Sequence, residues 1–384
     1  MSRPSIGIRR IHSIDISVHD ARPWLEYFTR GFGFQLVAAT SGEHLEETGT
    51  REHLLRCGEV AVTISEPVHA GSRVRRYLRL HPEGVSRLRF AVDDAGVAEE
   101  RLIERNATPT EALVVQKLDD GREWREARIA TPLGEVEFCF VQVADGAAAN
   151  SSGGGAGITL LPGMKPAGDF DPKRNRLGLS AIDHLTANAR TLMPVIAFCE
   201  HVLGFTRFWG VQFHTDNLRP GDGTGLRCVV MHDEASGVKI AVNEPMRPRF
   251  NNSQPQLAVD ANRGPGIHHL AFAVGDIMKA FDAAHAGDIE FLHTPATYYE
   301  ALPGRIATQG ITGVTQTVAD LRTRGILLDG DKGGYLLQAF CKDRVNPDLG
   351  ERSGPLFFEL VQRCGAAGFG EGNFRALMEA MERA

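Results

Sequence analysis

The stretch GPGIHHLAFAVGDI, residues 264–277, around which the chain is organised, places two adjacent histidines in an apolar, strand-like run. Successive side chains of a strand point to opposite faces, so His269, Ala271 and Ala273 share one face. Alternation therefore allows only one of His268 and His269 to face a cavity. Taken alone, a histidine in such a strand is better interpreted as a core residue than as a metal ligand.

Two further strand-like stretches carry candidate ligands. AIDHLTANA, residues 181–189, contains His184, and GPLFFELVQR, residues 354–363, contains Glu359 among apolar side chains. Burying a carboxylate is costly unless it is paired or bound to a cation. Two imidazoles and one carboxylate make the facial triad that leaves coordination positions open on Fe(II). The alternative for Glu359 is an ordinary salt bridge, for example to Arg363.

The composition indicates a globular protein. The chain has 384 residues, of which 42% are hydrophobic and 23% charged, which suits two domains. The net charge of −6 is scattered, which argues against nucleic acid or a membrane as a partner. Six widely spaced cysteines include no CxxC pair and are expected to be reduced core residues of a cytoplasmic protein. No apolar run approaches the roughly 18 residues of a membrane span.

The second half of the chain repeats the first. A small, glycine-rich segment, residues 146–178, is expected to link an N-terminal domain, residues 1–145, to a C-terminal domain, residues 179–384. GIHHLAFAVGDI (266–277) matches GVSRLRFAVDDA (84–95), GPLFFELVQ (354–362) matches GEVEFCFVQ (134–142), and residues 182–205 match residues 11–34. Such similarity indicates a duplicated module.

The duplication separates ligands from structural residues. His184 falls opposite Ser13, His269 opposite Arg87 and Glu359 opposite Cys139. A residue that the fold itself requires is expected in both copies, whereas these candidates occur in one. The first domain is therefore expected to be structural, without a metal, and to offer a surface for a homo-oligomer such as a dimer or tetramer.

Together with further motifs, these residues resemble the 4-hydroxyphenylpyruvate dioxygenase family. This is the two-domain branch of the vicinal-oxygen-chelate superfamily, and hydroxymandelate synthase is related to it. The resemblance covers the whole second half and is weaker in the first. Its motifs, in chain order, are LPG (161–163), IDH (182–184), NEP (243–245), SQ (253–254), GPGIHHLAF (264–272), TYYEAL (297–302), GYLLQAF (334–340), FFELVQR (357–363) and GFGEGNFRAL (368–377).

The resemblance implies a fold, a cofactor and a reaction. The fold is α+β, with tandem βαβββ modules forming two open β-barrel domains and a C-terminal helix closing the active site. One Fe(II) per chain is held by His184, His269 and Glu359. His269 is chosen because the family's second histidine follows a glutamine, which His268 replaces here. The reaction decarboxylates and hydroxylates an aromatic 2-oxo acid with dioxygen, taking 4-hydroxyphenylpyruvate to homogentisate in tyrosine catabolism.

The resemblance also implies a set of substrate contacts. Polar contacts to the ring end of the substrate are expected from Asn243, Gln254 and Gln338. Phe340 and Phe357 are expected to form the cavity wall, and Phe369, Asn373 and Phe374 a lid over the site. Phe340 and Phe357 could instead be plain core residues, and Asn373 could cap the last helix. The full set comprises Cys228, Asn243, Gln254, His268, Gln338, Phe340, Phe357, Phe369, Asn373 and Phe374.

Two of these positions depart from the family pattern. His268 stands where the family has glutamine, and Cys228, in LRCVVM (226–231), stands where it usually has serine. Directional hydrogen bonds discriminate strongly between substrates, so a changed substrate is an open alternative. The resemblance also implies that Phe374 favours the homogentisate-forming type, because hydroxymandelate synthases typically carry an aliphatic residue at this position.

Three other functions are consistent with these residues. The first is a related iron oxygenase that uses a different 2-oxo acid or hydroxylates a benzylic carbon. The second is a non-redox metal enzyme of the same fold. The third is a protein that binds a small molecule without chemistry, although such a protein need not keep open metal positions.

Overall fold

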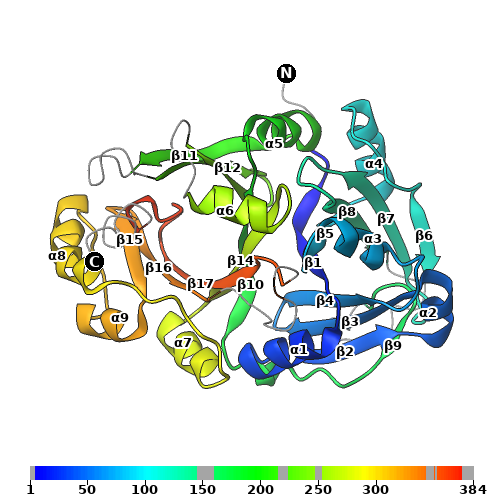
Figure 1. Cartoon of the computed structure of the whole chain (residues 1–384), viewed down its shortest axis with the longest axis horizontal. Coiled ribbons are helices and arrows are strands. Elements are labelled where there is room, and N and C mark those ends of the chain that lie inside the picture. The colour runs from blue at the N-terminus through cyan, green and yellow to red at the C-terminus, as the bar shows by residue number, and fades with distance from the viewer. Residues whose placement is uncertain are drawn as a thin grey trace.

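The computed structural model describes residues 5–144, 160–214, 224–246, 253–342, 350 and 353–373. Two curved sheets lie side by side, the first drawn in blue to cyan except for its green edge strand β9, and the second in green to red (Figure 1). The first has nine strands in the order β6-β7-β8-β5-β1-β4-β3-β2-β9, and the second has eight in the order β11-β12-β13-β10-β14-β17-β16-β15.

In both modules, helices connect strands of the sheet along the chain. The elements of the first module are β1 (Ile8–Ser17), α1 (Ala21–Glu26), the π-helical turn η1 (Tyr27–Gly31), β2 (Gln35–Thr40), α2 (Gly42–Thr48), β3 (Thr50–Cys57), β4 (Val60–Pro67), α3 (Arg73–Leu80), β5 (Gly84–Val92), α4 (Ala95–Glu104), β6 (Val114–Lys117), β7 (Glu123–Ala130) and β8 (Glu137–Ala144). β9 (Met164–Pro166) and the 3-10 turn η2 (Pro172–Arg174) follow.

The second module has a similar order of elements, with two additional helices before its last three strands and no described counterpart of α2. Its elements are β10 (Leu179–Asn188), α5 (Met193–Phe198), the π-helical turn η3 (Cys199–Leu203), β11 (Thr206–His214), β12 (Gly225–His232), β13 (Lys239–Pro245), α6 (Gln254–Ala261), β14 (Gly266–Val274), α7 (Ile277–His285), α8 (Ala296–Gln309), α9 (Val318–Arg324), β15 (Leu327–Asp331), β16 (Gly334–Phe340) and β17 (Phe357–Cys364).

The eight strands of the second sheet correspond one to one with β1 to β8 of the first, and β9 is an additional edge strand of the first sheet. In the first, β1 pairs with β4 in parallel and with β5 in antiparallel fashion, and β5 pairs with β8 in parallel. In the second, β10, β13, β14 and β17 make the same three pairings. The predicted duplication and the α+β fold with two open half-barrels are therefore confirmed.

Local signals in the sequence account for the helices that follow the central strands. Asp94 caps α4 by accepting a hydrogen bond from the backbone of Val97, and Asp276 caps α7 by accepting one from Lys279. These two aspartates occupy matching positions in the repeated stretches. An aspartate at this position satisfies a backbone N–H that the helix itself leaves without a partner.

Each module covers the back of the other's sheet with a helix. Phe28 of η1 and Phe32, which directly follows η1, pack their rings on Phe358 of β17, with centroid separations of 5.2 and 5.6 Å. In the reciprocal contact, Phe198 of α5 lies 6.0 Å from Phe138 of β8. The strands that carry His269 and Glu359 are thus supported from behind by the first module.

The segment that joins the modules takes part in the first sheet. β9 pairs with β2, and Leu161 and Met164 are buried in a small apolar cluster with Trp124. Residues 145–159 lie outside the described residues, as does Phe374 with most of the predicted C-terminal helix. Within the described ranges, none of the helices has the length and apolar character needed to cross a membrane.

Candidate metal centre

The three candidate ligands meet because of the register of three neighbouring strands. Ala271 of β14 pairs with His184 of β10 on one side and with Glu359 of β17 on the other. His269 lies two residues before Ala271. The Nε2 atoms of His184 and His269 are 3.5 and 3.7 Å from Glu359 Oε2. The three ligand atoms all lie within 4.8 Å of one another.

The chemistry of this donor set fits a divalent cation. His184 and Glu359 are almost fully buried, at 3% and 1% exposure. Glu359 Oε1 accepts a hydrogen bond, but Oε2 has no hydrogen-bond partner among the described residues. A buried carboxylate oxygen without a partner is costly, and a cation among the three donors would satisfy it. Two histidines and one carboxylate would leave positions free for other ligands.

The two imidazoles have opposite electrostatic surroundings. Burial lowers the pKa of His269 well below its usual value, so the ring is neutral near pH 7 and its lone pair can bind a metal. Burial alone would also lower the pKa of His184, but the hydrogen bond to Asp183 and the nearby negative charge of Glu359 outweigh it and raise that pKa.

Asp183 and Arg363 fix the orientation of His184. His184 Nδ1 lies 2.8 Å from Asp183 Oδ1, which leaves Nε2 for the metal position. Arg363 donates to both carboxylate oxygens of Asp183, at 2.6 and 2.7 Å. A carboxylate on the outer nitrogen of a ligand histidine sets its tautomer and raises its basicity. Arg363, considered above as a partner for Glu359, therefore serves Asp183 instead.

Two bulges put adjacent residues on the same side of a strand. The pairing of β10 with β14 shifts between Ile182 and His184, and again between Thr186 and Ala187, opposite His268. The rings of His268 and His269 consequently both contact the ring of Phe357, with centroid separations of 4.8 and 4.7 Å. Simple alternation fails here, because a bulge adds one unpaired residue. Asp183 was missed for the same reason.

His269 is confirmed as the member of the ligand cluster, and His268 lies beside it. Their Nδ1 atoms are 3.2 Å apart. Burial lowers the pKa of His268 to about 4, so its ring is neutral near pH 7. His268 thus brings a neutral, polar ring to the place next to the ligand set.

Aromatic rings surround the ligand atoms. Phe357 stacks on His269, and Phe340 lies 6.4 Å from the same imidazole. The ring centroid of Phe369 lies 4.5 Å from that of His184. The same ring stacks on Trp209, with a centroid separation of 6.3 Å. All three phenylalanines were proposed from the sequence as wall or lid, and each contacts a ligand histidine. Trp209 was not anticipated, since no residue pattern around it points to the site.

The polar residues proposed from the sequence have different surroundings. Cys228 and Asn243 face each other across β12 and β13, and Asn243 Nδ2 donates to Asn188 Oδ1 at 3.1 Å. Cys228 is buried in an apolar cluster that Phe369 joins. Gln254 is exposed in the first turn of α6. The substrate contacts proposed for all of these residues stay predictions. Gln254 has no described contact with the ligands, and Phe374 is outside the described residues.

Gln338 and Asn373 are joined to the ligand set by hydrogen bonds. Gln338 Nε2 donates to Glu359 Oε1 at 2.8 Å, and Asn373 Nδ2 donates to Gln338 Oε1 at 2.8 Å. Both side chains are buried. Residues 371–373 are already helical, so Asn373 lies inside the first turn and does not cap a helix that starts at residue 374.

The equivalent place in the first module holds ion pairs. Arg89 of β5 pairs with Ser13 of β1 and with Cys139 of β8, which is the register of Ala271 in the second module. The predicted correspondence of Ser13 with His184 and of Cys139 with Glu359 is therefore confirmed. Arg87 occupies the place of His269 and donates to Glu137 at 2.6 Å.

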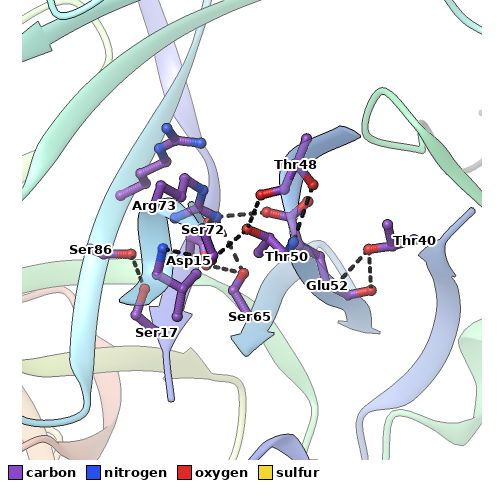
Figure 2. Close-up of polar contacts among 12 residues, drawn as sticks. Asp15, Ser17, Thr40, Thr48, Thr50, Glu52, Ser65, Ser72, Arg73 and Ser86 are labelled. Carbon is purple, nitrogen blue, oxygen red and sulfur yellow. Dashed lines mark hydrogen bonds and ion pairs between the residues drawn. The ribbon is translucent and has the colours of Figure 1, made fainter. Parts of the chain in front are cut away.

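Buried carboxylates of the first module are bound by arginines. Figure 2 shows Arg73 of α3 reaching Asp15 and Glu52, the latter at 2.6 Å, while Ser65 donates to Asp15 at 2.6 Å. On β7 of the same sheet, Arg128 donates to Glu126 at 2.7 Å. Within the described residues, the cluster of ligand atoms that could hold a metal ion is the one in the second module.

Comparison with known proteins agrees with this site. Residues 10–125 and 181–302 match the model of the Glyoxalase/Bleomycin resistance protein/Dioxygenase superfamily, one match for each module. The chain therefore belongs to that superfamily. A structure of a triple mutant of 4-hydroxymandelate synthase from Streptomyces coelicolor has the same fold, with a TM-score of 0.78 and 24% identity, and covers 98% of this chain and 99% of that one.

The sequence comparison narrows the class to a family. The chain is 30% identical over 366 residues to 4-hydroxyphenylpyruvate dioxygenase of Dictyostelium discoideum, covering 93% of both proteins. It is 30% identical over 384 residues to the protein of the same name from Danio rerio, covering 97% of this chain and 89% of that one. The chain belongs to the 4-hydroxyphenylpyruvate dioxygenase family, and its 2-His-1-carboxylate site is the ligand set of non-haem iron dioxygenases.

Proposed function

We propose that this protein is an Fe(II)-dependent dioxygenase that converts 4-hydroxyphenylpyruvate and dioxygen into homogentisate and CO2. The reaction needs no other co-substrate. The observation that carries the proposal is the buried triad of His184, His269 and Glu359, in which Glu359 Oε2 has no hydrogen-bond partner within the part of the chain that the structure describes. Relatives that are 30% identical over nearly the whole chain bear the name of this activity. A bound Fe(II) would supply the activation of dioxygen and a chelating position for a 2-oxo acid.

The protein's own residues orient and shield the reacting groups. The Asp183–Arg363 pair holds His184 in one tautomer. The rings of Phe340, Phe357 and Phe369, close to the ligand histidines, offer an apolar surface for an aromatic side chain. Exclusion of water by such a surface strengthens electrostatic interactions at the site and limits side reactions.

His268 favours one second candidate, a related iron oxygenase with a changed aromatic 2-oxo acid. Its imidazole is neutral near pH 7 and lies against Phe357 and His269. A ring nitrogen at this place offers one directional hydrogen bond, whereas the amide of a glutamine would offer both a donor and an acceptor. Because unpaired polar groups discriminate strongly between substrates, this exchange could move the preference away from the 4-hydroxyphenyl ring.

Oxygen uptake by the Fe(II)-loaded protein tests the proposal. With 4-hydroxyphenylpyruvate, we expect one dioxygen consumed for each homogentisate formed, identified by the ring-proton pattern in NMR. Formation of 4-hydroxymandelate would show benzylic hydroxylation instead. Tight iron binding without uptake on this substrate, but with uptake on another aromatic 2-oxo acid, would support the second candidate. An iron-loaded protein that consumes no dioxygen with any aromatic 2-oxo acid would contradict both.

A further inference from the structure

The carboxylate of Glu359 is the end of a buried chain of hydrogen bonds. Its Oε1 atom accepts from Gln338 Nε2, and Gln338 Oε1 accepts from Asn373 Nδ2, each at 2.8 Å. The exposures of Gln338 and Asn373 are only 5% and 2%. Both amides are therefore largely occupied by each other and by the metal ligand.

The series of hydrogen bonds continues to helix α8. The Tyr298 hydroxyl donates to Asn373 Oδ1 at 2.6 Å and accepts from the backbone N–H of Leu328 at 3.0 Å. Leu328 O lies 3.1 Å from the same hydroxyl, and the shorter contact with Asn373 takes its single hydrogen. Arg305, also on α8, places Nη2 3.4 Å from Asn373 Oδ1 and its guanidinium 5.0 Å from the centre of the Tyr298 ring.

The donors on α8 give the chain a direction. A phenol and a guanidinium both point at Asn373 Oδ1, so the Nδ2 group of that amide faces Gln338. Gln338 must then accept through Oε1, which turns its Nε2 group towards Glu359. With both amides reversed, an amide oxygen would face the carboxylate and repel it. Hydrogen bonds aligned head to tail in this way polarise and strengthen one another in a buried site.

We propose that Tyr298, assisted by Arg305, is a positioning residue that acts through Asn373 and Gln338 on the metal ligand Glu359. The chain holds Oε1 in a hydrogen bond and presents Oε2 alone to the two histidines, whose Nε2 atoms lie 3.5 and 3.7 Å from it. A carboxylate held in this way would offer a metal one oxygen, which would leave positions for a 2-oxo acid and dioxygen. This inference rests on the proposed function, since it assigns a role around the same metal site.

Tyr299 is a matched control within the same helix. Its exposure is 2%, against 1% for Tyr298, and its hydroxyl donates to the backbone oxygen of Ile326 at 3.2 Å. It has no described contact with Asn373. A role limited to packing and backbone hydrogen bonding would therefore make Tyr298→Phe and Tyr299→Phe equivalent.

The test uses Co(II) as a spectroscopic probe of the full-length protein. We expect Tyr298→Phe to change the visible d–d bands of the bound Co(II) and to weaken Co(II) binding about 10-fold, the size typical of lost outer-shell contacts. Tyr299→Phe should keep the wild-type spectrum and affinity while losing similar thermal stability. With Fe(II) and substrate, Tyr298→Phe should consume more dioxygen per product molecule, whereas Tyr299→Phe should keep the wild-type ratio.

Asn373→Asp provides a second variant if Tyr298→Phe does not fold. An aspartate can still accept from Tyr298 and Arg305 but cannot donate to Gln338, so it should alter the Co(II) spectrum in the same direction. The inference is overturned if these variants bind Co(II) with the spectrum and affinity of Tyr299→Phe while the wild type is active. A wild-type protein that binds neither Co(II) nor Fe(II) would overturn the proposed function itself, and this inference with it.

Discussion

Arg89 of β5 stands at the position that Ala271 of β14 occupies in the second module. Arg89 pairs with Ser13 and Cys139, and Ala271 pairs with the ligands His184 and Glu359. The methyl group of Ala271 leaves space between two ligands, whereas the guanidinium of Arg89 is buried, with Asp15 and Glu126 each 3.8 Å away. One duplicated framework therefore supports a metal site in one copy and an ion-pair cluster in the other.

Loss of any ligand should abolish metal binding. We expect His184→Ala, His269→Ala and Glu359→Ala to bind no stoichiometric Fe(II), because two remaining donors make a weak site. His268→Ala is the matched control, since it lies beside His269 but outside the ligand cluster. It should retain iron and change the relative rates on different 2-oxo acids. Iron content of the purified, Fe(II)-loaded variants provides the measurement, and iron loss in His268→Ala but not in His269→Ala would refute the assignment.

The Asp183–His184 contact should contribute to metal affinity. Asp183→Asn keeps the shape of the side chain but loses the negative charge that Arg363 and His184 contact. We expect metal binding to weaken about 10- to 100-fold, as for other outer partners of ligand histidines. A Co(II) titration measures the change, with the exposed Asp331→Asn as control. Equal affinities of the two variants would show that Asp183 does not support the site.

The ion pairs of the first module should act on stability and not on metal content. Arg73→Ala leaves Asp15 and Glu52 without their arginine. Breaking a buried pair from one side costs about 3–5 kcal/mol. We therefore expect urea unfolding at a clearly lower denaturant concentration with unchanged iron stoichiometry. Arg79→Ala, on the exposed side of the same helix, should unfold like the wild type. An Arg73→Ala protein as stable as Arg79→Ala would contradict this assignment.

His12 should make the protein sensitive to mild acid. Burial, reinforced by Arg10 and Arg89, lowers the pKa of His12 to about 3. The unfolded chain, with an ordinary histidine pKa near 6.5, binds more protons between these two values. The free energy of unfolding therefore falls as pH drops from about 6.5 towards 3, by up to about 1.4 kcal/mol per pH unit from this residue. Urea titrations at pH 7 and pH 5 should show a smaller loss in His12→Asn, and equal losses in both proteins would rule out this role.

The sequence predicted the parts of the site that depend on strand register. His184, His269 and Glu359 were found from apolar strands and from their absence in the first copy, and strand pairing brings them together as expected. Residue patterns alone did not choose between His268 and His269, and the choice came from the family resemblance. The repeat could identify ligands because both copies keep the same pairing of their central strands.

The remaining features depend on geometry that a linear pattern does not contain. Strict alternation would place Asp183 and His268 on the strand face opposite to their neighbours His184 and His269. A bulge at each of the two residues breaks this alternation. The hydrogen bonds of Gln338 with Glu359 and Asn373 join residues that are distant in the sequence, so no linear pattern shows them, and the contact of Gln338 with substrate stays a prediction. The domain boundaries, the homo-oligomer and the cytoplasmic location stay predictions from the sequence.

Anomalous diffraction at the iron K-edge from crystals of the Fe(II)-loaded protein tests the central claim most directly. The claim is that one of two matching modules carries one iron site. We expect a single strong peak per chain, within coordination distance of His184 Nε2, His269 Nε2 and Glu359. A peak in the first module near Asp15 and Arg89, or no peak at the three ligands, would contradict it.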